Sequence, residues 1–407
     1  MVLLLVLLLF FSQNLTGIQS KKRRQWIVAA SFLYLAITTV DWLFLYGYLG
    51  RPFHFSDPTN YYDWTVKIPF NGIFQLEHSS NIFYLIVNWI YNHIYEEPYL
   101  ISIFIRLDNI FVFLIAYMIL TRDLKNFGFN DLLILLNPYL ILMLLRNVRD
   151  AYILLFIGIV LLGLGVIRNV KHRKWYLLFG LIMIGMTRSI LLLVFGVIYL
   201  LGLIRKKRAL AFIIVPAIVG LIVVFSSQII GLITNQALSA MEAANEDAEE
   251  MAYLIGDGNT FASILPLMKR FVVGTISLIL TPHPINFYTK WVASADAFGS
   301  YGIYTAIDNL LILSGAILCY CCILPRFISY IIHPKTNNRF LFQFILLYTI
   351  LYVVAYLGIT DIRNRFLIYF FVLIDYIRSQ KQFSLKTNTI YYVISFTLFI
   401  FVAIVSK

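Results

Sequence analysis

Long apolar stretches separated by short basic clusters make up most of the 407-residue chain. A membrane-spanning helix needs about 20 apolar residues, because the hydrocarbon core of a bilayer is about 30 Å thick. We therefore predict an all-α, polytopic integral membrane protein with about 11–13 transmembrane or re-entrant helices in a single transmembrane domain, residues 1–407. The clearest spans are predicted over residues 26–48, 100–120, 130–145, 151–167 and 366–377.

Clusters of lysine and arginine decide the predicted orientation, since basic loops tend to stay in the cytoplasm. We assign residues 21–24, 122–125, 168–174 and 205–208 to the cytoplasmic side. This arrangement places a first outer loop at residues 51–98 and an acidic outer loop at residues 234–262. The membrane side of residues 264–300 and 361–365 depends on whether the helix predicted over 264–280 crosses or re-enters.

The stretch 175–204 lies between two cytoplasmic clusters and is too long for one simple crossing. As a single straight helix it would be about 45 Å long, against a hydrocarbon thickness of about 30 Å. One crossing would also place its two basic flanks on opposite sides of the membrane. We therefore predict two short crossings that turn at residues 186–189, which lifts Arg188 to the outer side.

Composition supports the membrane class and argues against a soluble globular protein and against a nucleic-acid-binding protein. Hydrophobic residues make up 61% of the chain and charged residues only 13%, which does not describe a soluble core with a polar shell. The net charge of +12 comes from the short loops between apolar spans, so we reject nucleic-acid binding. The cysteines Cys319, Cys321 and Cys322 have no histidine or carboxylate at ligand spacing, so no metal or cofactor is expected.

The first outer loop contains an acid followed by tyrosines: Asp57, Tyr61, Tyr62 and Asp63. A carboxylate beside the membrane can act as general base toward an acceptor hydroxyl, and tyrosine rings can stack on sugars. The alternative is that Asp57 with Pro58 caps a helix, next to tyrosines of the membrane interface. Both interpretations remain open from the residues alone.

Downstream, residues 81–95 predict an amphipathic helix that is too short to span. Such a helix would lie in the membrane interface and border the entry path of a lipid-linked substrate. Its apolar face is predicted to consist of Phe83, Ile86, Val87, Ile90 and Ile94.

Arginines near the predicted ends of spans suggest an anionic substrate. Arg146 and Arg149 are three residues apart and would share one helical face, where their forked donors suit a phosphate or diphosphate. The alternative is a set of local ion pairs, such as Arg149 with Asp150. Convergence on the outer side favours anion recognition. The residues predicted to bind substrate are Tyr61, Tyr62, Asp63, Asp150, Arg188, His283, Arg363 and Arg365.

The order of these features resembles that of the GT-C-type membrane glycosyltransferases and the related Wzy/EpsG-type polysaccharide polymerases. The resemblance rests on the first-loop acid with its tyrosines, on Asn137-Pro138, on the Arg149-Asp150 pair that heads a helix, and on a late Arg-x-Arg at residues 363–365. It covers roughly residues 57–369. The chain departs from EpsG in having Arg-Asp where Arg-Gln is usual.

The resemblance implies an enzyme of the bacterial inner membrane that transfers or polymerises undecaprenyl-diphosphate-linked sugars in envelope polysaccharide (O-antigen, capsule or exopolysaccharide) synthesis. Its partners would be a lipid-linked sugar donor, a saccharide acceptor, membrane lipids and other polysaccharide-export proteins. Asp57, Arg146 and Arg149 would then be the catalytic residues. The alternative is a flippase or transporter of lipid-linked sugars, although repeated halves typical of transporters are not visible.

Overall fold

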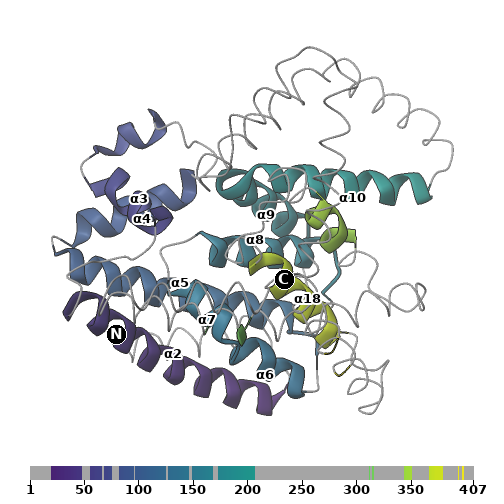
Figure 1. Ribbon diagram of the computed structural model, residues 1–407. Helices are drawn as coiled ribbons and strands as arrows, with labels where there is room; N and C mark the ends of the chain where they lie inside the picture. The colour runs from purple at the N-terminus through teal and green to yellow at the C-terminus, as the bar shows by residue number, and fades with distance from the viewer. Residues whose placement is uncertain are drawn as a thin grey trace.

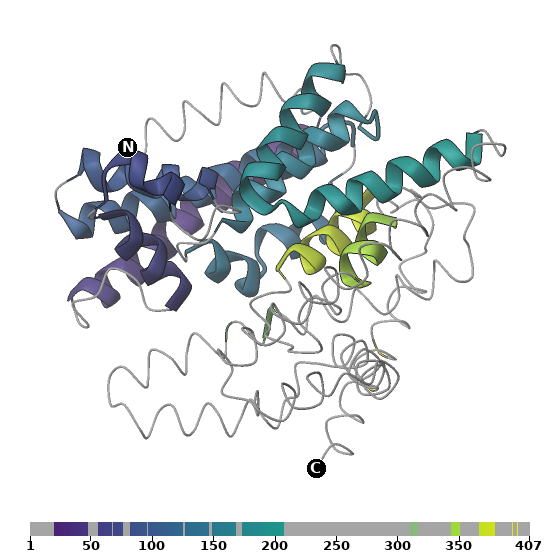
Figure 2. The ribbon, with the colours of Figure 1, turned by 90° about the horizontal axis from the view of Figure 1, so that it is seen from above.

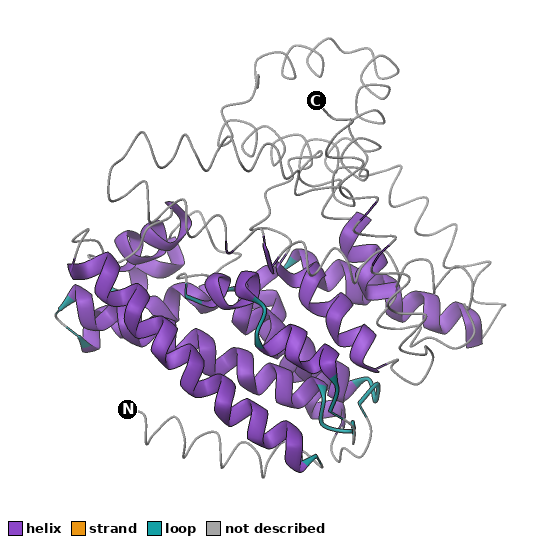
Figure 3. Ribbon diagram, turned by 60° about the horizontal axis from the view of Figure 1, so that its bottom comes forward, coloured by secondary structure: helices purple, strands orange, loops and turns teal. Residues whose placement is uncertain are grey.

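The computed structural model describes residues 20–47, 56–66, 68–75, 82–95, 97–124, 127–145, 149–167, 173–206, 311, 314, 315, 343–350, 366–378, 393 and 397. Within these residues every regular element is helical and none is a strand (Figure 3). The predicted all-α class is therefore confirmed for the described part of the chain. Two helices, Lys21–Phe44 and Pro98–Leu120, are long and apolar enough to cross a membrane, judged by length and composition.

Helices α2 (Lys21–Gly47) and α5 (Pro98–Leu120) lie side by side and run in opposite directions (Figure 1). Near the start of α2, Arg23 donates to the carbonyl of Thr121, directly after α5. Near the other end, the Trp42 indole donates to the carbonyl of Tyr99 at 3.0 Å. The predicted spans 26–48 and 100–120 therefore correspond to an antiparallel helix pair.

The predicted span 130–145 is wrong as a single helix, because the chain breaks it into α6 (Phe129–Leu135) and α7 (Pro138–Leu144). Proline has no N–H to continue a helix and disfavours helical conformation in the residue before it. Asn137 caps the new start, and its side-chain oxygen accepts from the amides of Tyr139 and Leu140 at 3.0 and 3.3 Å. The Asn-Pro pair therefore marks a helix interruption.

Helices α8 (Asp150–Gly163) and α9 (Arg173–Arg188) form a tightly packed hairpin. A Cβ added at Gly163 would lie 2.5 Å from the Leu177 nitrogen, and one at Gly180 would lie 2.7 Å from Val160 Cγ2. Small residues at such contacts let helix backbones approach closely, which is how helices associate inside membranes. The hairpin brings the start of α8 next to the end of α9.

After α9 the chain turns at Ser189 and continues as α10 (Ile190–Lys206). The predicted division of residues 175–204 into two helices near 186–189 is confirmed. Ser189 is exposed, whereas Leu191 and Thr187 on either side of the turn are buried.

Later segments return to the centre of the bundle. Helix α18 (Phe366–Arg378) packs on α5 through Phe370 and Phe113, whose ring centroids are 5.5 Å apart. Residues 343–350 are also helical, and Phe344 stacks on Phe195 of α10 at 5.3 Å. The C-terminal part of the chain therefore contributes to the same core as α5.

The α3–α4 segment, which consists of α3 (Ser56–Val66), η1 (Phe70–Gln75) and α4 (Ile82–Ile94), lies at one end of the bundle (Figures 1 and 2). The prediction of a loop around Asp57 is wrong for the backbone, because Ser56 to Val66 form a helix. The predicted acidic loop 234–262 lies outside the described residues.

Helix α4 confirms the short helix predicted over 81–95, but its apolar face is divided between two environments. Phe83 packs against Tyr152 and Phe156 of α8, with ring centroids 5.3 and 5.2 Å apart. Ile90 and Ile94 are 42% and 63% exposed. Helix α4 therefore packs on α5, α8 and α9 along much of its length, and only its C-terminal part has an uncovered apolar surface.

Candidate functional site

Three of the predicted site residues meet where the α8–α9 hairpin closes. Asp150 is the first residue of α8, Arg149 precedes it, and Arg188 is the last residue of α9. The Nη1 atom of Arg188 lies 3.8 Å from Oδ1 of Asp150. Asp150 therefore forms an ion pair across the hairpin, with a residue 38 positions later in the sequence.

Tyr348 completes this group from the later part of the chain. The guanidinium carbon of Arg188 lies 5.8 Å from the centre of the Tyr348 ring, within the range of a cation–π contact. The side chains of Arg188 and Asp150 keep 13% and 25% of their surface exposed. We call Arg149, Asp150, Arg188 and Tyr348 the Arg149 cluster; its ion pair remains partly exposed.

Arg149 is half-buried, and its Nη1 atom is buried without a hydrogen-bond partner among the described residues. A guanidinium has five N–H donors, and leaving a buried one unmade costs free energy. The side chain also stands at the start of α8, where the helix dipole favours negative charge. This combination suits an anion with several acceptor oxygens, such as a phosphate.

The other predicted arginines and His283 are not placed. Arg146, His283, Arg363 and Arg365 lie outside the described residues. Asp57 lies in the first turn of α3, but its side chain is outside the described part. Their predicted roles stay predictions.

The tyrosines after Asp57 differ in their surroundings. Tyr61 is 8% exposed, and its ring meets those of Tyr84 and Trp64 edge-on at 5.2 and 5.8 Å. Tyr62 is half-buried, and burial together with the neighbouring Asp63 raises the pKa of its hydroxyl. Tyr61 therefore belongs to the core, while Tyr62 and the exposed Asp63 are more accessible.

An acid that the sequence analysis did not select, Asp108 of α5, lies between three helices. The Tyr152 hydroxyl of α8 donates to Oδ2 of Asp108, and Tyr91 of α4 is a second hydrogen-bonding neighbour. Asp108 is half-buried, whereas its neighbours Leu107 and Asn109 are buried at 5% and 1% exposure. We call this group the Asp108 seam; its members are Tyr84, Asn88, Tyr91, Asp108, Asn109 and Tyr152.

The tyrosines that α4 contributes to the seam are hydrogen-bond donors at neutral pH. Burial, and next the Asp108 carboxylate, raises the pKa of Tyr91. Burial also raises the pKa of Tyr84, and a hydrogen bond with Asn109 offsets part of that rise. Neither hydroxyl loses its proton near pH 7, so both can donate to an oxygen nearby.

Asp108 carried a signal that the sequence reasoning missed. It interrupts the apolar stretch 100–120 together with Arg106 and Asn109. An ionisable residue inside a spanning segment is costly and is a functional candidate by default. Arg106 is accounted for, because its Nε lies 3.3 Å from Asp41 of α2 and it is 1% exposed.

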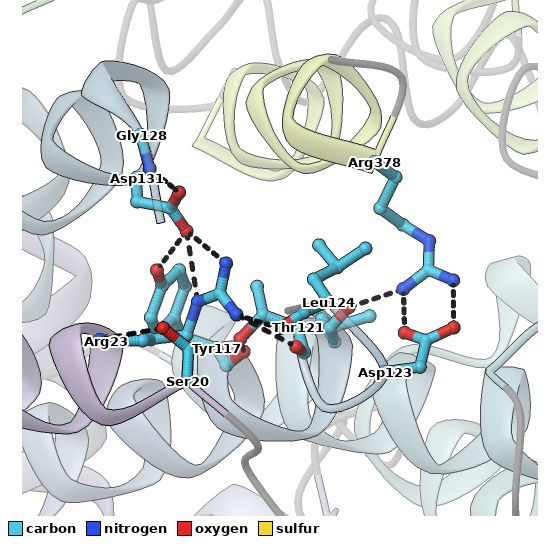
Figure 4. A network of polar contacts seen from close by, with 10 residues as sticks. Ser20, Arg23, Tyr117, Thr121, Asp123, Leu124, Gly128, Asp131 and Arg378 are labelled. Atoms are coloured by element: carbon cyan, nitrogen blue, oxygen red, sulfur yellow. Dashed lines mark hydrogen bonds and ion pairs between the residues drawn. The ribbon is translucent and has the colours of Figure 1, made fainter. Parts of the chain in front are cut away.

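A second charged region, which we call the Arg23 network, joins the start of α2 to the region after α5 (Figure 4). Arg23 and Asp131 are both fully buried, and two guanidinium nitrogens reach Asp131 Oδ1 at 3.1 and 3.2 Å. Tyr117 donates to the same oxygen at 2.6 Å, and the Gly128 amide donates to the other at 2.9 Å. Arg23 also donates to the carbonyls of Thr121 and Leu124.

Beside this network, Arg378 of α18 binds Asp123 with both ends of its guanidinium fork (Figure 4). The two N–O distances are 2.8 and 2.9 Å, and the Leu120 carbonyl accepts a further bond at 2.8 Å. This Arg378 pair ties the last described long helix to the end of α5. Its geometry satisfies both charges, so it is a structural link.

No group of three or more potential metal-ligating side chains occurs within the described ranges. Comparisons with protein-family models, with curated proteins and with solved structures found no match to this chain.

Proposed function

We propose that this chain is a polytopic protein of the bacterial inner membrane that transfers or polymerises sugars carried on undecaprenyl diphosphate for an envelope polysaccharide. The observation that carries the proposal is the Arg149 cluster, in which two arginines stand at adjoining helix ends beside a single acid. Their formal charges leave an excess of positive charge, which suits the diphosphate of a lipid-linked donor.

In this proposal the arginines act on the leaving group. As the anomeric carbon–oxygen bond breaks, negative charge grows on the diphosphate, and nearby guanidinium groups stabilise that charge. Asp150 of α8 pairs with Arg188, and the Tyr348 ring contacts the same guanidinium. An acid then takes the proton of the acceptor hydroxyl; Asp57 is the one that the family resemblance suggests.

The function is tested by deleting the gene in its native host and separating lipid-linked and surface polysaccharides on a gel. A polymerase predicts single repeat units that reach the outer face and never lengthen. A transferase for one sugar predicts a truncated repeat unit. Complete units trapped on the cytoplasmic face would replace the proposal with a flippase, and an unchanged polysaccharide profile would refute it.

Membrane topology is tested separately with single cysteines at two exposed positions, Ser189 and Arg24, after replacing Cys319, Cys321 and Cys322 with serine. A maleimide that cannot cross the membrane should label Ser189→Cys in intact spheroplasts. It should label Arg24→Cys only after permeabilisation. Labelling of both cysteines in intact spheroplasts would contradict the predicted arrangement.

A further inference from the structure

We infer that Asp108 is the group that receives the proton of the acceptor hydroxyl, an inference that rests on the proposed glycosyl transfer. Asp108 meets the two requirements for this role better than any other described carboxylate. It contacts Tyr152, which follows Arg149 by three residues, and part of its surface remains accessible.

The connection to the Arg149 cluster runs through the first turn of α8. Tyr152, which donates to Asp108, follows Arg149 by three residues, and its amide bonds the Arg149 carbonyl at 3.1 Å. Residues three apart lie on one face of a helix. Asp108 is therefore joined, through Tyr152, to the helical turn that begins at Arg149; the carboxylate can accept a proton, and the guanidinium can hold an anion.

The other described acids near this end are committed or distant. Asp150 pairs with Arg188, and Asp41 pairs with Arg106. Asp63 of α3 and Glu97, directly before α5, are exposed on the surface. The hydrogen-bonding neighbours of Asp108 are Tyr152 and Tyr91, and no described cation lies within 4 Å of its carboxylate as an ion pair.

The surroundings also suit a sugar acceptor. Tyrosine hydroxyls are donors and acceptors of the kind that bind sugar hydroxyls. Tyr84, Asn88, Asn109 and Tyr152 of the Asp108 seam are 8% exposed or less, so the members that an acceptor can reach are the half-buried Tyr91 and Asp108. The seam lies between α4 and the α5–α8 layer, where Tyr84 and Tyr152 pack 5.8 Å apart. The α3–α4 segment would therefore form one wall of the acceptor path.

The reaction step balances without a further reactant. The acceptor oxygen forms a bond to the anomeric carbon of the donor sugar, and its proton passes to a carboxylate oxygen of Asp108. The bond between that carbon and the diphosphate oxygen breaks, and its electron pair leaves with the diphosphate. Arg149 and Arg188 then stabilise the departing anion, and the proton on Asp108 returns to solvent.

The alternative role for Asp108 is structural, as a buried acceptor that fastens α4 and α8 to α5. Asparagine distinguishes the two roles, because it has nearly the same shape and still accepts the Tyr152 hydrogen bond but is no base. Tyr152→Phe is the matched control, since it removes the hydrogen bond and keeps the carboxylate.

The experiment expresses full-length variants in the deletion host and measures polymer per folded protein. Binding of undecaprenyl diphosphate to the purified protein in nanodiscs is the second readout. Asp108→Asn should lower polymer formation about 100-fold or more, the usual effect of removing a general base. Its binding of undecaprenyl diphosphate should stay within about twofold, and Tyr152→Phe should lose less than about tenfold of polymer.

Three results would overturn the inference while leaving the proposed function intact. In the first, Asp108→Asn supports polymer formation within about threefold of the unmodified protein. In the second, Tyr152→Phe and Asp108→Asn lose activity equally, which indicates a structural hydrogen bond. In the third, Asp57→Asn abolishes polymer formation and Asp108→Asn does not. If Asp108→Asn does not fold, the pair Asp108→Glu and Asp108→Gln decides, since only the glutamate should keep measurable activity.

Discussion

The Arg23 network and the Arg149 cluster both join arginine to aspartate at helix ends, yet they are built differently. In the first, the arginine and the acid are fully buried and their closest atoms are 3.1 Å apart. In the second, the pair is separated by 3.8 Å and remains partly exposed, and a neighbouring arginine has a buried nitrogen without a described partner.

The difference separates a structural role from the proposed role in binding an anion. Taking a charge out of water costs several kcal/mol, which only close pairing and full hydrogen bonding offset. The Arg23 network meets this condition through Tyr117, Gly128 and two carbonyls. In the Arg149 cluster the buried Nη1 atom of Arg149 has no described hydrogen-bond partner, which is consistent with the proposed anion ligand.

The largest effect on stability is expected from Asp131→Ala, which leaves Arg23 buried without its acid. Breaking one side of a buried pair costs about 3–5 kcal/mol, so little folded protein should remain in the membrane. Fluorescence-detected size exclusion of a fusion protein measures the folded fraction. The double variant Arg23→Met with Asp131→Leu should recover most of the folded fraction. If it does not, the charges of the network do more than fill space in the core.

Arg188→Ala should act on activity instead of folding. Removing a donor that stabilises developing charge lowers turnover about 100–1,000-fold, so polymer per folded protein should fall by that factor. Arg188→Lys should be intermediate, since it keeps the charge and loses the fork. Arg173→Ala, at the exposed opposite end of α9, is the control and should stay near the unmodified value. Equal effects of Arg188→Ala and Arg173→Ala would contradict an anion site.

Asp123→Asn tests an intermediate case, because the Arg378 pair is well formed but keeps 10% and 12% of its side-chain surface exposed. Water can partly replace the lost charge, so we expect destabilisation of about 1–3 kcal/mol, below that of Asp131→Ala. Thermal unfolding in detergent, monitored as the loss of monomer, shows which of the two variants is less stable. If Asp123→Asn destabilised the protein more than Asp131→Ala, burial would not decide the free-energy cost of losing the acid.

The smallest effect is expected from Asp63→Asn on the exposed surface of α3. Surface substitutions without buried partners usually change stability by less than about 0.5 kcal/mol. The melting temperature should therefore be unchanged within error. A large fall in polymer formation at this unchanged stability would assign Asp63 to substrate binding, as the sequence analysis predicts.

Local patterns were sufficient to predict much of the helical framework. Apolar stretches and their flanking charges located α2, α5, α8 and α18 within a few residues, and the length of residues 175–204 predicted the turn near Arg188. The break at Asn137 was missed as a helix interruption, although proline at position 138 is a local signal for one.

What the sequence by itself determined is the helical class, the approximate helix ends and the presence of arginines beside them. Only the tertiary structure decided the partners: Asp150 pairs with Arg188 and not with Arg149, and Arg23 pairs with an acid 108 positions later. Ion pairs depend on distances across packed helices, and spacing along the chain contains no such distance. For the same reason Asp108 emerged as a candidate only once α4, α5 and α8 were seen around it.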